Sequence, residues 1–146
     1  MTVKSTQRKI VVPFDGSESA LRALRVAAAR KRETGAELHV LNVQPVIVSG
    51  NVRSFVSQDV INRYYEEEAA TAMAPAHKLL EAEKVPFVPV TRVGHPFEVI
   101  AEYADPFSND EIVMGSRGMS SLGNLVLGSV ATKVIHVARV PVTLVK

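Results

Sequence analysis

The chain has 146 residues, the size of one ordinary globular domain, and it has no cysteine, which excludes disulfides and thiolate chemistry. Its 17 basic and 15 acidic residues leave a formal net charge of +2, and they form no dense basic patch interleaved with aromatic residues, which argues against nucleic-acid binding. With no apolar leader and no uncharged apolar stretch of about 20 residues, the sequence predicts a soluble, cytoplasmic protein that does not enter membranes.

Strands and helices are predicted to alternate along the chain. Short apolar runs bounded by turn residues read as strands, and longer stretches with a helical repeat read as helices. The predicted strands are 10–14, 38–43, 87–93, 111–114 and 140–145, and the predicted helices are 17–34, 58–83, 96–104 and 128–138. Loops are expected over 44–57, 105–110 and 115–127.

Several residues mark the ends and irregularities of these helices. Ser17 is a suitable N-cap, and Gly35 is a natural helix stop. Pro96 suits the first position of the third helix. Pro75 lies inside the second helix and is expected to kink it or to split it in two. The last helix is expected to bury a stripe made of Val130, Val134, Val137 and Ala138.

Proline positions order the strands in the predicted sheet. Strands separated by helices predict an α/β fold: a doubly wound, Rossmann-like, five-stranded parallel sheet with helices on both faces, formed by one domain over 10–146 after a flexible tail, 1–9. Pro89 and Pro141 lack ladder donors and place the third and fifth strands at the edges. The predicted order is therefore 3-2-1-4-5, in which a crevice opens at the carboxyl ends of strands one and four. Asp15 and Gly115 end those strands and are expected to face each other.

A glycine pattern after the fourth predicted strand carries the clearest chemical signal. Gly115 is followed after two residues by Gly118, and after nine more by Gly128-Ser129 at the start of a helix. Glycines let backbone N–H groups approach an anion, and a helix N-terminus favours phosphate. Arg117 can add a forked, charge-assisted contact. The segment is predicted to hold phosphate; the alternative is that its glycines only make a flexible loop.

Other chemical signatures are absent from the sequence. It contains no Gly-x4-Gly-Lys-Ser/Thr motif, and no Gly-x-Gly-x-x-Gly follows the first strand, so neither a P-loop enzyme nor a dinucleotide fold is indicated. The four histidines lack metal-ligand spacing. No residue stands out as a general base or as a catalytic group.

Four segments match a known family. They are Ile-Val-Val-Pro-Phe-Asp-Gly-Ser-Glu at 10–18, Leu-Asn-Val at 41–43, Val-Gly-His-Pro at 93–96, and Ile-Val-Met-Gly-Ser-Arg-Gly at 112–118 with Gly128-Ser129-Val130. With them the chain resembles the universal stress protein family from Ile10 to Lys146. That family has members that carry the glycine pattern and bind ATP, and members that lack both. The intact pattern here implies the ATP-binding branch.

The resemblance also implies which residues surround the nucleotide. The adenine and ribose end would consist of Pro13, Asp15 and Val43. The phosphate end would consist of Gly115, Arg117, Gly118, Gly128, Ser129 and Val130, with Met114 nearby. The implied ligand is ATP, with or without Mg²⁺, and no metal ligand is assigned. Asp in Asp-Gly-Ser is more often a turn or capping residue, and Asp15 can fill both roles.

The leading hypothesis is a regulatory stress-response protein whose loop 116–127 orders around ATP. A slow ATPase stays open as an alternative, although no water-orienting residue is evident. A nucleotide-free dimerisation module is another, because the apolar edge strand 140–145 tends to pair and the resemblance implies homodimers through it. An FMN-binding, flavodoxin-like protein is a fourth.

Overall fold

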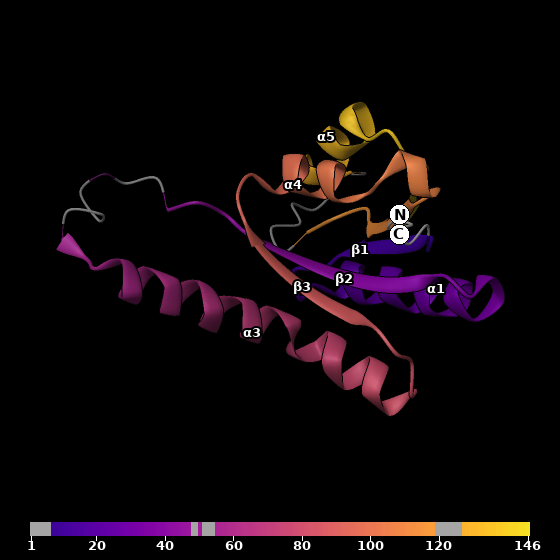
Figure 1. Ribbon diagram of the computed structural model, residues 1–146, viewed down its shortest axis with the longest axis horizontal. Coiled ribbons are helices and arrows are strands. Elements are labelled where there is room, and N and C mark those ends of the chain that lie inside the picture. The colour runs from indigo at the N-terminus through magenta and orange to yellow at the C-terminus, as the bar shows by residue number, and fades with distance from the viewer. Residues whose placement is uncertain (1–6, 48–49, 51–54, 119–126) are drawn as a thin grey trace, which may run out of the picture.

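A parallel sheet of five strands forms the centre of the molecule (Figure 1). The computed structural model describes residues 7–47, 50, 55–118 and 127–146. Its strands are β1 (Lys9–Pro13), β2 (Glu37–Gln44), β3 (Val88–Val93), β4 (Glu111–Gly115) and β5 (Val142–Val145). All neighbouring strands pair in parallel, in the order β3-β2-β1-β4-β5. The predicted strand order is confirmed. β1 begins at Lys9, the last residue that the sequence assigned to the tail.

Helices cover both faces of the sheet. Those described are α1 (Glu18–Thr34), α3 (Gln58–Ala82), α4 (Pro96–Tyr103) and α5 (Ser129–Val137), with a 3-10 turn η1 (Pro106–Ser108). Figure 1 shows α1 and α3 below the sheet and α4 and α5 above it. None of these helices is both long and apolar enough to span a bilayer.

Two cores lie on either side of the central strands. Ile10 and Val12 of β1 face α1 and α3, whereas Val11 faces α4 and α5, and all three are fully buried. A strand covered on both faces needs a continuous apolar run, which is why β1 lacks the alternation of a half-exposed strand. The carboxyl ends of β1 and β4 are thereby fixed side by side.

The ends of α1 form as the sequence predicts. The Ser17 hydroxyl oxygen accepts the N–H of Ala20 at 3.1 Å, which caps the helix at its start. Gly35 adopts a left-handed conformation with φ 73°, and its N–H donates to the carbonyl of Lys31 at 2.8 Å. α1 therefore starts and stops at defined residues, and its first turn lies directly after β1.

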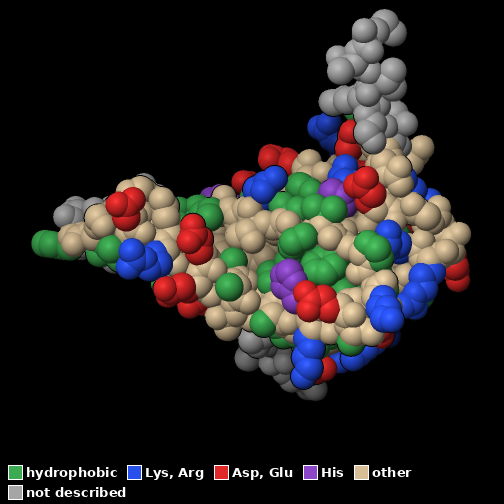
Figure 2. Space-filling view, turned by 60° about the horizontal axis from the view of Figure 1, so that its bottom comes forward, with side chains coloured by type: hydrophobic (Ala, Val, Ile, Leu, Met, Phe, Trp, Pro, Cys, Tyr) green, Lys and Arg blue, Asp and Glu red, His purple; other side chains and the backbone are tan. Residues whose placement is uncertain are grey.

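Pro75 does not split α3, which runs as one helix from Gln58 to Ala82. Met73, Ala76 and Leu80 are buried against the core on both sides of the proline, so their packing holds the helix together despite the missing N–H donor. The N-terminal half of α3 extends past the sheet as an arm that carries charged side chains of both signs (Figures 1 and 2).

Other expectations need correction. Val137, expected in the buried stripe of α5, is 46% exposed, and Ala131 is buried beside Val134 instead. Ala138, the next residue, packs against the core with Ala131 and Val134, whereas Val137 lies to the side of this buried face. The predicted loop 105–110 contains the turn η1. The backbone is helical at Gly50 and Phe55, within the predicted loop 44–57, much of which lies outside the described residues.

Candidate functional site

Asp15 lies in the turn that follows β1, and its two carboxylate oxygens point to different parts of the chain. Its Oδ1 accepts the N–H of Ser17 at 2.9 Å, which is the expected turn role. Gly16 makes that turn with φ +87°, a conformation that favours glycine. The other carboxylate oxygen, Oδ2, points toward the second chain reversal, since a Cβ placed on Gly118 would lie 3.2 Å from it.

Gly115 ends β4 in direct contact with α1. A Cβ at this position would lie 2.7 Å from the carbonyl carbon of Ser19, which is closer than real Cβ atoms come to other atoms. The hydroxyl oxygen of Ser19 also accepts the N–H of Arg117 at 3.2 Å. Only a glycine fits at the end of β4 here, and the buried Ser19 holds the chain that follows it.

The two ends of the glycine-rich segment lie against each other. The N–H of Gly128 donates to the carbonyl of Ser116 at 2.6 Å. A Cβ on Gly128 would lie 3.4 Å from the Cα of Arg117 and 3.5 Å from the nitrogen of Gly118. Residues 119–126, the middle of the predicted loop, lie outside the described part of the chain. The described residues on the two sides of this gap, 116–118 and 128, are therefore in contact.

The start of α5 has no capping side chain. Gly128 is the N-cap, with an extended backbone and no side-chain hydrogen bond to the first turn. Its carbonyl accepts both the N–H and the hydroxyl of Thr132, at 3.0 and 2.9 Å. Helix N-termini carry unsatisfied N–H groups and a partial positive charge, which suits an anion. Ser129 is exposed and Val130 half-buried at this end.

The residues expected at the adenine and ribose end lie at the ends of β1 and β2. Pro13 pairs with Leu41, two residues before Val43, and both Pro13 and Val43 are half-buried. The Asn42 side chain between them is buried and donates to the carbonyl of Phe14 at 2.9 Å. This bond ties the end of β2 to the turn that carries Asp15.

Met114 differs from the other expected site residues. Its side chain is 4% exposed and packs in the core under α4 and α5, together with Ile112 and Ala131. Neighbouring residues of a strand point to opposite faces, so Met114 enters the core on one face while Gly115 meets α1 on the other. Any contact that Met114 makes at this edge of the sheet is through its backbone.

Arg117 is the cation of the site. It is exposed and forms no ion pair with any described residue. Within the described ranges, no group of three or more His, Cys, Asp or Glu residues is suited to hold a metal ion. The site thus combines one carboxylate, one guanidinium that has no ion-pair partner among the described residues, and the N–H groups at the start of α5.

Gly115 is predicted from the sequence for an incomplete reason, and Ser19, which contacts it, is not predicted. Gly115 was predicted for its approach to an anion, whereas its contact with Ser19 already requires glycine. Ser19 itself was not predicted. Its signal in the sequence is a serine two residues after the N-cap of a helix, at the start of the face that also buries Ala20, Ala23, Leu24, Ala27 and Ala28.

Two hollows lie away from this site. One, of about 270 Å³, lies beside α3 at the carboxyl ends of β2 and β3 and is lined by Val46, Ile47, Gln58, Ile61, Asn62, Tyr65 and Val93. The other, of about 460 Å³, lies at the amino ends of the central strands and is lined by Arg8, Pro106, Ser108, Asn109, Asp110, Arg139, Val140 and Pro141. Neither includes Asp15 or Gly118.

The fold and the paired turns define the class of protein. It is a doubly wound α/β protein in which two chain reversals meet at the switch point of the sheet, the place where such folds bind ligands. The model of the universal stress protein family matches residues 6–146. The chain belongs to the universal stress protein family, as its sequence motifs indicated.

Relatives match over nearly the whole chain. Universal stress protein MJ0531 of Methanocaldococcus jannaschii is 34% identical over 139 residues, which cover 95% of this chain and 82% of the relative. A universal stress protein of Thermus aquaticus, named for its place in the 3' region of a QAH/OAS sulfhydrylase, is 33% identical over 146 residues, which cover 95% of this chain and 98% of the relative.

Solved structures agree with the fold. The structure of MJ0577 from Methanocaldococcus jannaschii has a TM-score of 0.78 at 34% identity and covers 97% of this chain and 96% of its own. The universal stress protein of Archaeoglobus fulgidus in complex with dAMP has a TM-score of 0.62 at 25% identity and covers 96% of this chain and 98% of its own. That relative is therefore a nucleotide-binding protein.

Proposed function

We propose that this protein binds an adenine nucleotide, ATP, at the carboxyl ends of β1 and β4, and acts as a regulatory protein of the stress response. The observation that carries the proposal is the approach of Asp15 to Gly118. It brings a hydrogen-bond acceptor beside a group of backbone donors. A nucleotide has the complementary pattern, because its base and ribose donate hydrogen bonds and its phosphates accept them.

The phosphates are proposed to lie at the start of α5. The N–H groups of Ser129 and Val130, the Ser129 hydroxyl and the N–H of Gly118 would donate to phosphate oxygens, since the N–H groups of Ser116 and Arg117 already donate to Val145 and Ser19. Gly128 supports this arrangement, since it has no side chain to fill the space beside Arg117 and Gly118. Arg117, which has no ion-pair partner among the described residues, would add a charged contact.

The adenosine is proposed to lie toward β2. Asp15 Oδ2 would accept from a ribose hydroxyl or from the adenine amino group, while Pro13 and Val43 would supply apolar contacts. Met114 would contribute only its backbone, because its side chain is buried. The relative that was solved with dAMP supports an adenine nucleotide as the class of ligand.

Binding rather than rapid hydrolysis is the function that this geometry favours. Asp15, the one carboxylate assigned to the site, already accepts the N–H of Ser17 and is proposed to contact the base or the ribose, which leaves no assigned carboxylate to activate a water molecule. Mg²⁺, if it takes part, would arrive bound to the phosphates. A slow ATPase would be recognised by phosphate release that disappears in Arg117→Ala.

The assembly is proposed to be a homodimer that forms through β5. This strand is at the edge of the sheet, and all four of its residues are only partly buried in the single chain. An apolar edge strand with unpaired backbone groups tends to pair with a second copy.

Calorimetric titration with ATP, ADP and AMP tests the proposed function. We expect affinity to rise with the number of phosphates, and Arg117→Ala to weaken ATP binding by about tenfold or more, the effect of one charge-assisted contact. Arg25→Ala is the matched control, because Arg25 is an exposed arginine of α1 without an ion-pair partner in the described chain. No heat at millimolar ATP would contradict the proposal.

A further inference from the structure

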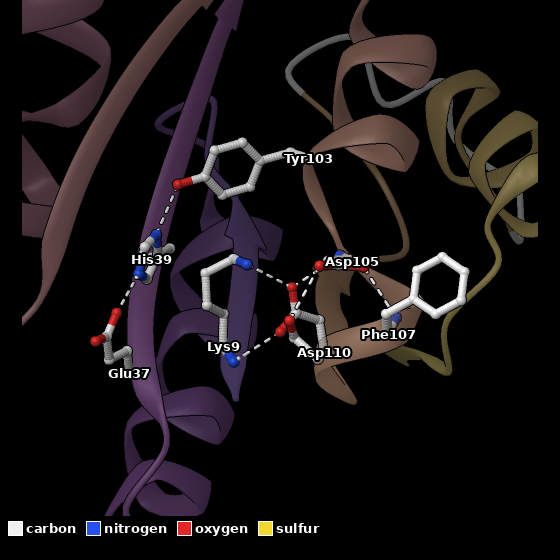
Figure 3. A network of polar contacts seen from close by, with 8 residues as sticks. Lys9, Glu37, His39, Tyr103, Asp105, Phe107 and Asp110 are labelled. Atoms are coloured by element: carbon white, nitrogen blue, oxygen red, sulfur yellow. Dashed lines mark hydrogen bonds and ion pairs between the residues drawn. The ribbon is translucent and has the colours of Figure 1, made fainter. Parts of the chain in front are cut away.

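Phe107 is the most exposed large apolar side chain among the described residues, at 93%. It lies in the turn η1 between α4 and β4, at the amino ends of the strands and thus at the opposite edge of the sheet from Asp15. Figure 3 shows its ring pointing away from Asp110 and from the sheet. A phenylalanine in this position contributes nothing to the core.

The turn that carries Phe107 is held by a dense set of hydrogen bonds. The Asp105 carboxylate accepts the N–H of Phe107 at 2.9 Å and the hydroxyl of Ser108 at 3.0 Å. Asn109 closes the turn in a left-handed conformation with φ 56°, which asparagine tolerates better than most residues. The backbone around the exposed ring is therefore ordered.

Asp110 anchors this turn to β1. Its carboxylate is completely buried and forms an ion pair with the ammonium of Lys9 at 2.6 Å. It also accepts hydrogen bonds from the backbone N–H of Lys9 at 2.9 Å and from that of Asp105 at 2.8 Å (Figure 3). Buried carboxylates are kept only where partners satisfy them in this way. Phe107 is thus presented by a fixed turn, and a preorganised anchor loses little entropy when it binds a partner.

A groove of about 460 Å³ adjoins the exposed ring. The turn itself supplies four of its lining residues, and the segment after α5 supplies Val140 and Pro141. The four residues of the turn are Pro106, Ser108, Asn109 and Asp110. Val140 is 9% exposed and gives the groove an apolar floor. We call this surface, with Phe107 on its edge, the Phe107 groove.

The charge that the Phe107 groove presents is positive. Arg139 forms no ion pair with a described residue, and Arg8 has a partly exposed side chain that lies 3.5 Å from a carboxylate oxygen of Glu111. Glu111 also pairs with Arg30 at 3.1 Å, and Asp110 is balanced by Lys9. Glu111 and Asp110 are therefore compensated by cations within the protein, whereas Arg139 has no ion-pair partner among the described residues.

We propose that the Phe107 groove is the docking site for an extended segment of a partner protein in which carboxylates alternate with apolar side chains. Aromatic rings and arginines dominate the binding energy of protein interfaces, and both are present here at the surface. The carboxylates of the partner would meet Arg8 and Arg139, and its apolar side chains would cover Phe107 and Val140.

Charge favours this occupant over two others. A second copy of the chain, paired about a two-fold axis, would bring the arginines of both grooves toward each other. Single-stranded nucleic acid is bound by several stacked rings along a continuous cationic track, whereas this groove has one exposed ring and two guanidinium groups. The proposal is independent of nucleotide binding, since the groove lies at the other edge of the sheet.

Fluorescence anisotropy tests the docking site with a short fluorescein-labelled peptide in which glutamate and leucine alternate. We expect the wild-type protein to bind it, and Phe107→Ala and Arg139→Glu each to weaken binding by about tenfold or more. Phe55→Ala is the matched control for the ring, since Phe55 is 87% exposed at the end of the α3 arm. Arg25→Glu is the matched control for the charge, and both controls should bind as the wild type does.

Several results would overturn the docking site. They are the absence of binding by the wild-type protein, equal binding of a peptide with lysine at every glutamate position, and equal losses in the Phe55→Ala and Arg25→Glu controls. Tighter binding of labelled oligothymidylate would assign the groove to nucleic acid instead. Sedimentation equilibrium that shows self-association lost in Phe107→Ala would assign it to a second copy. All four positions are exposed, so circular dichroism should show unchanged folding.

Discussion

A Cβ atom placed on Gly118 would lie 3.2 Å from Oδ2 of Asp15, so the turn after β1 and the turn after β4 meet at the carboxyl ends of these two strands. Hydrogen bonds also hold the turn after β4 in place. Ser19 of α1 accepts the N–H of Arg117, and Gly128 donates to Ser116. The proposed nucleotide site is therefore assembled by contacts of the Asp15 and Ser19 side chains with the backbone of a segment that is far away in the sequence.

Gly115→Ala should destabilise the fold. The added Cβ would lie 2.7 Å from backbone of Ser19, which cannot move without shifting α1, and overpacking of this kind costs about 1–3 kcal/mol. Urea unfolding of the purified variant measures the loss. A free energy of unfolding equal to that of the wild type would show that α1 and β4 are not packed as described.

Gly118→Ala should affect nucleotide binding rather than stability. Among the described residues, its Cβ would meet only the Asp15 carboxylate, and its backbone is not left-handed, so stability should change by less than about 1 kcal/mol. Nucleotide affinity should nevertheless fall, because the carboxylate must turn away from the site. A variant that is markedly unstable, or one that binds ATP as the wild type does, would contradict this assignment.

Asp15→Asn should separate the two roles of this residue. Asparagine keeps an oxygen that can accept the N–H of Ser17, so the turn and the stability of the protein should be largely retained. The loss of the charged acceptor should weaken ATP binding by about tenfold, as for one hydrogen bond to a charged group. Calorimetry together with thermal unfolding measures both effects. Unchanged affinity would exclude Asp15 from the ligand.

Asp110→Ala should be among the most destabilising single changes. It leaves the Lys9 ammonium without its partner and removes the acceptor of two backbone N–H groups, and breaking a buried ion pair costs about 3–5 kcal/mol. Glu83→Ala is the matched control, because Glu83 forms an exposed pair with Arg32 at 3.4 Å, for which about 1 kcal/mol or less is expected. Equal losses in urea unfolding would refute the structural role of Asp110.

Tyr103 makes the stability of the protein sensitive to alkaline pH. Burial raises the pKa of Tyr103 above its usual 10.0, while Lys9 and Arg92 act in the opposite direction. The folded state thus holds this proton more tightly than the unfolded chain, so the contribution is complete below pH 10.0 and is lost as the pH rises past that value. The free energy of unfolding should therefore fall above pH 10.0, in part because the folded state opposes the ionisation of Tyr103.

Tyr103→Phe checks this pH dependence. The Tyr103 hydroxyl lies 2.6 Å from Nδ1 of His39, whose Nε2 lies 2.8 Å from Glu37 (Figure 3), so its removal should cost about 1 kcal/mol at neutral pH. Above pH 10.0 the variant should lose stability less steeply than the wild type. Parallel curves for the two proteins in urea unfolding across this range would contradict the linkage.

Local features of the sequence were sufficient to predict the order of the strands. Apolar runs define β1 and β4, Pro89 and Pro141 mark the two edge strands, and the rule that parallel strands need crossover helices supplies the rest. Because the switch point follows from strand order alone, the meeting of the turns after β1 and β4 could also be predicted.

Details that depend on packing could not be predicted in the same way. The contact between Ser19 and Gly115 depends on how α1 is rotated about its axis relative to β4, which no local pattern specifies. Pro75 resembles a helix breaker in the sequence, but buried residues on both sides keep α3 continuous. Met114 was placed near the ligand by resemblance, and only the sheet shows that its side chain points into the core.

An NMR titration of labelled protein with ATP tests the central claim most directly, because backbone amide signals report where the ligand lies. We expect the largest shifts at Gly118, Gly128, Ser129 and Val130, with a smaller response at Ser17, whose N–H is bonded to Asp15. Amides of the Phe107 groove should not respond. No shifts at millimolar ATP, or shifts confined to residues away from the turns after β1 and β4, would contradict the account.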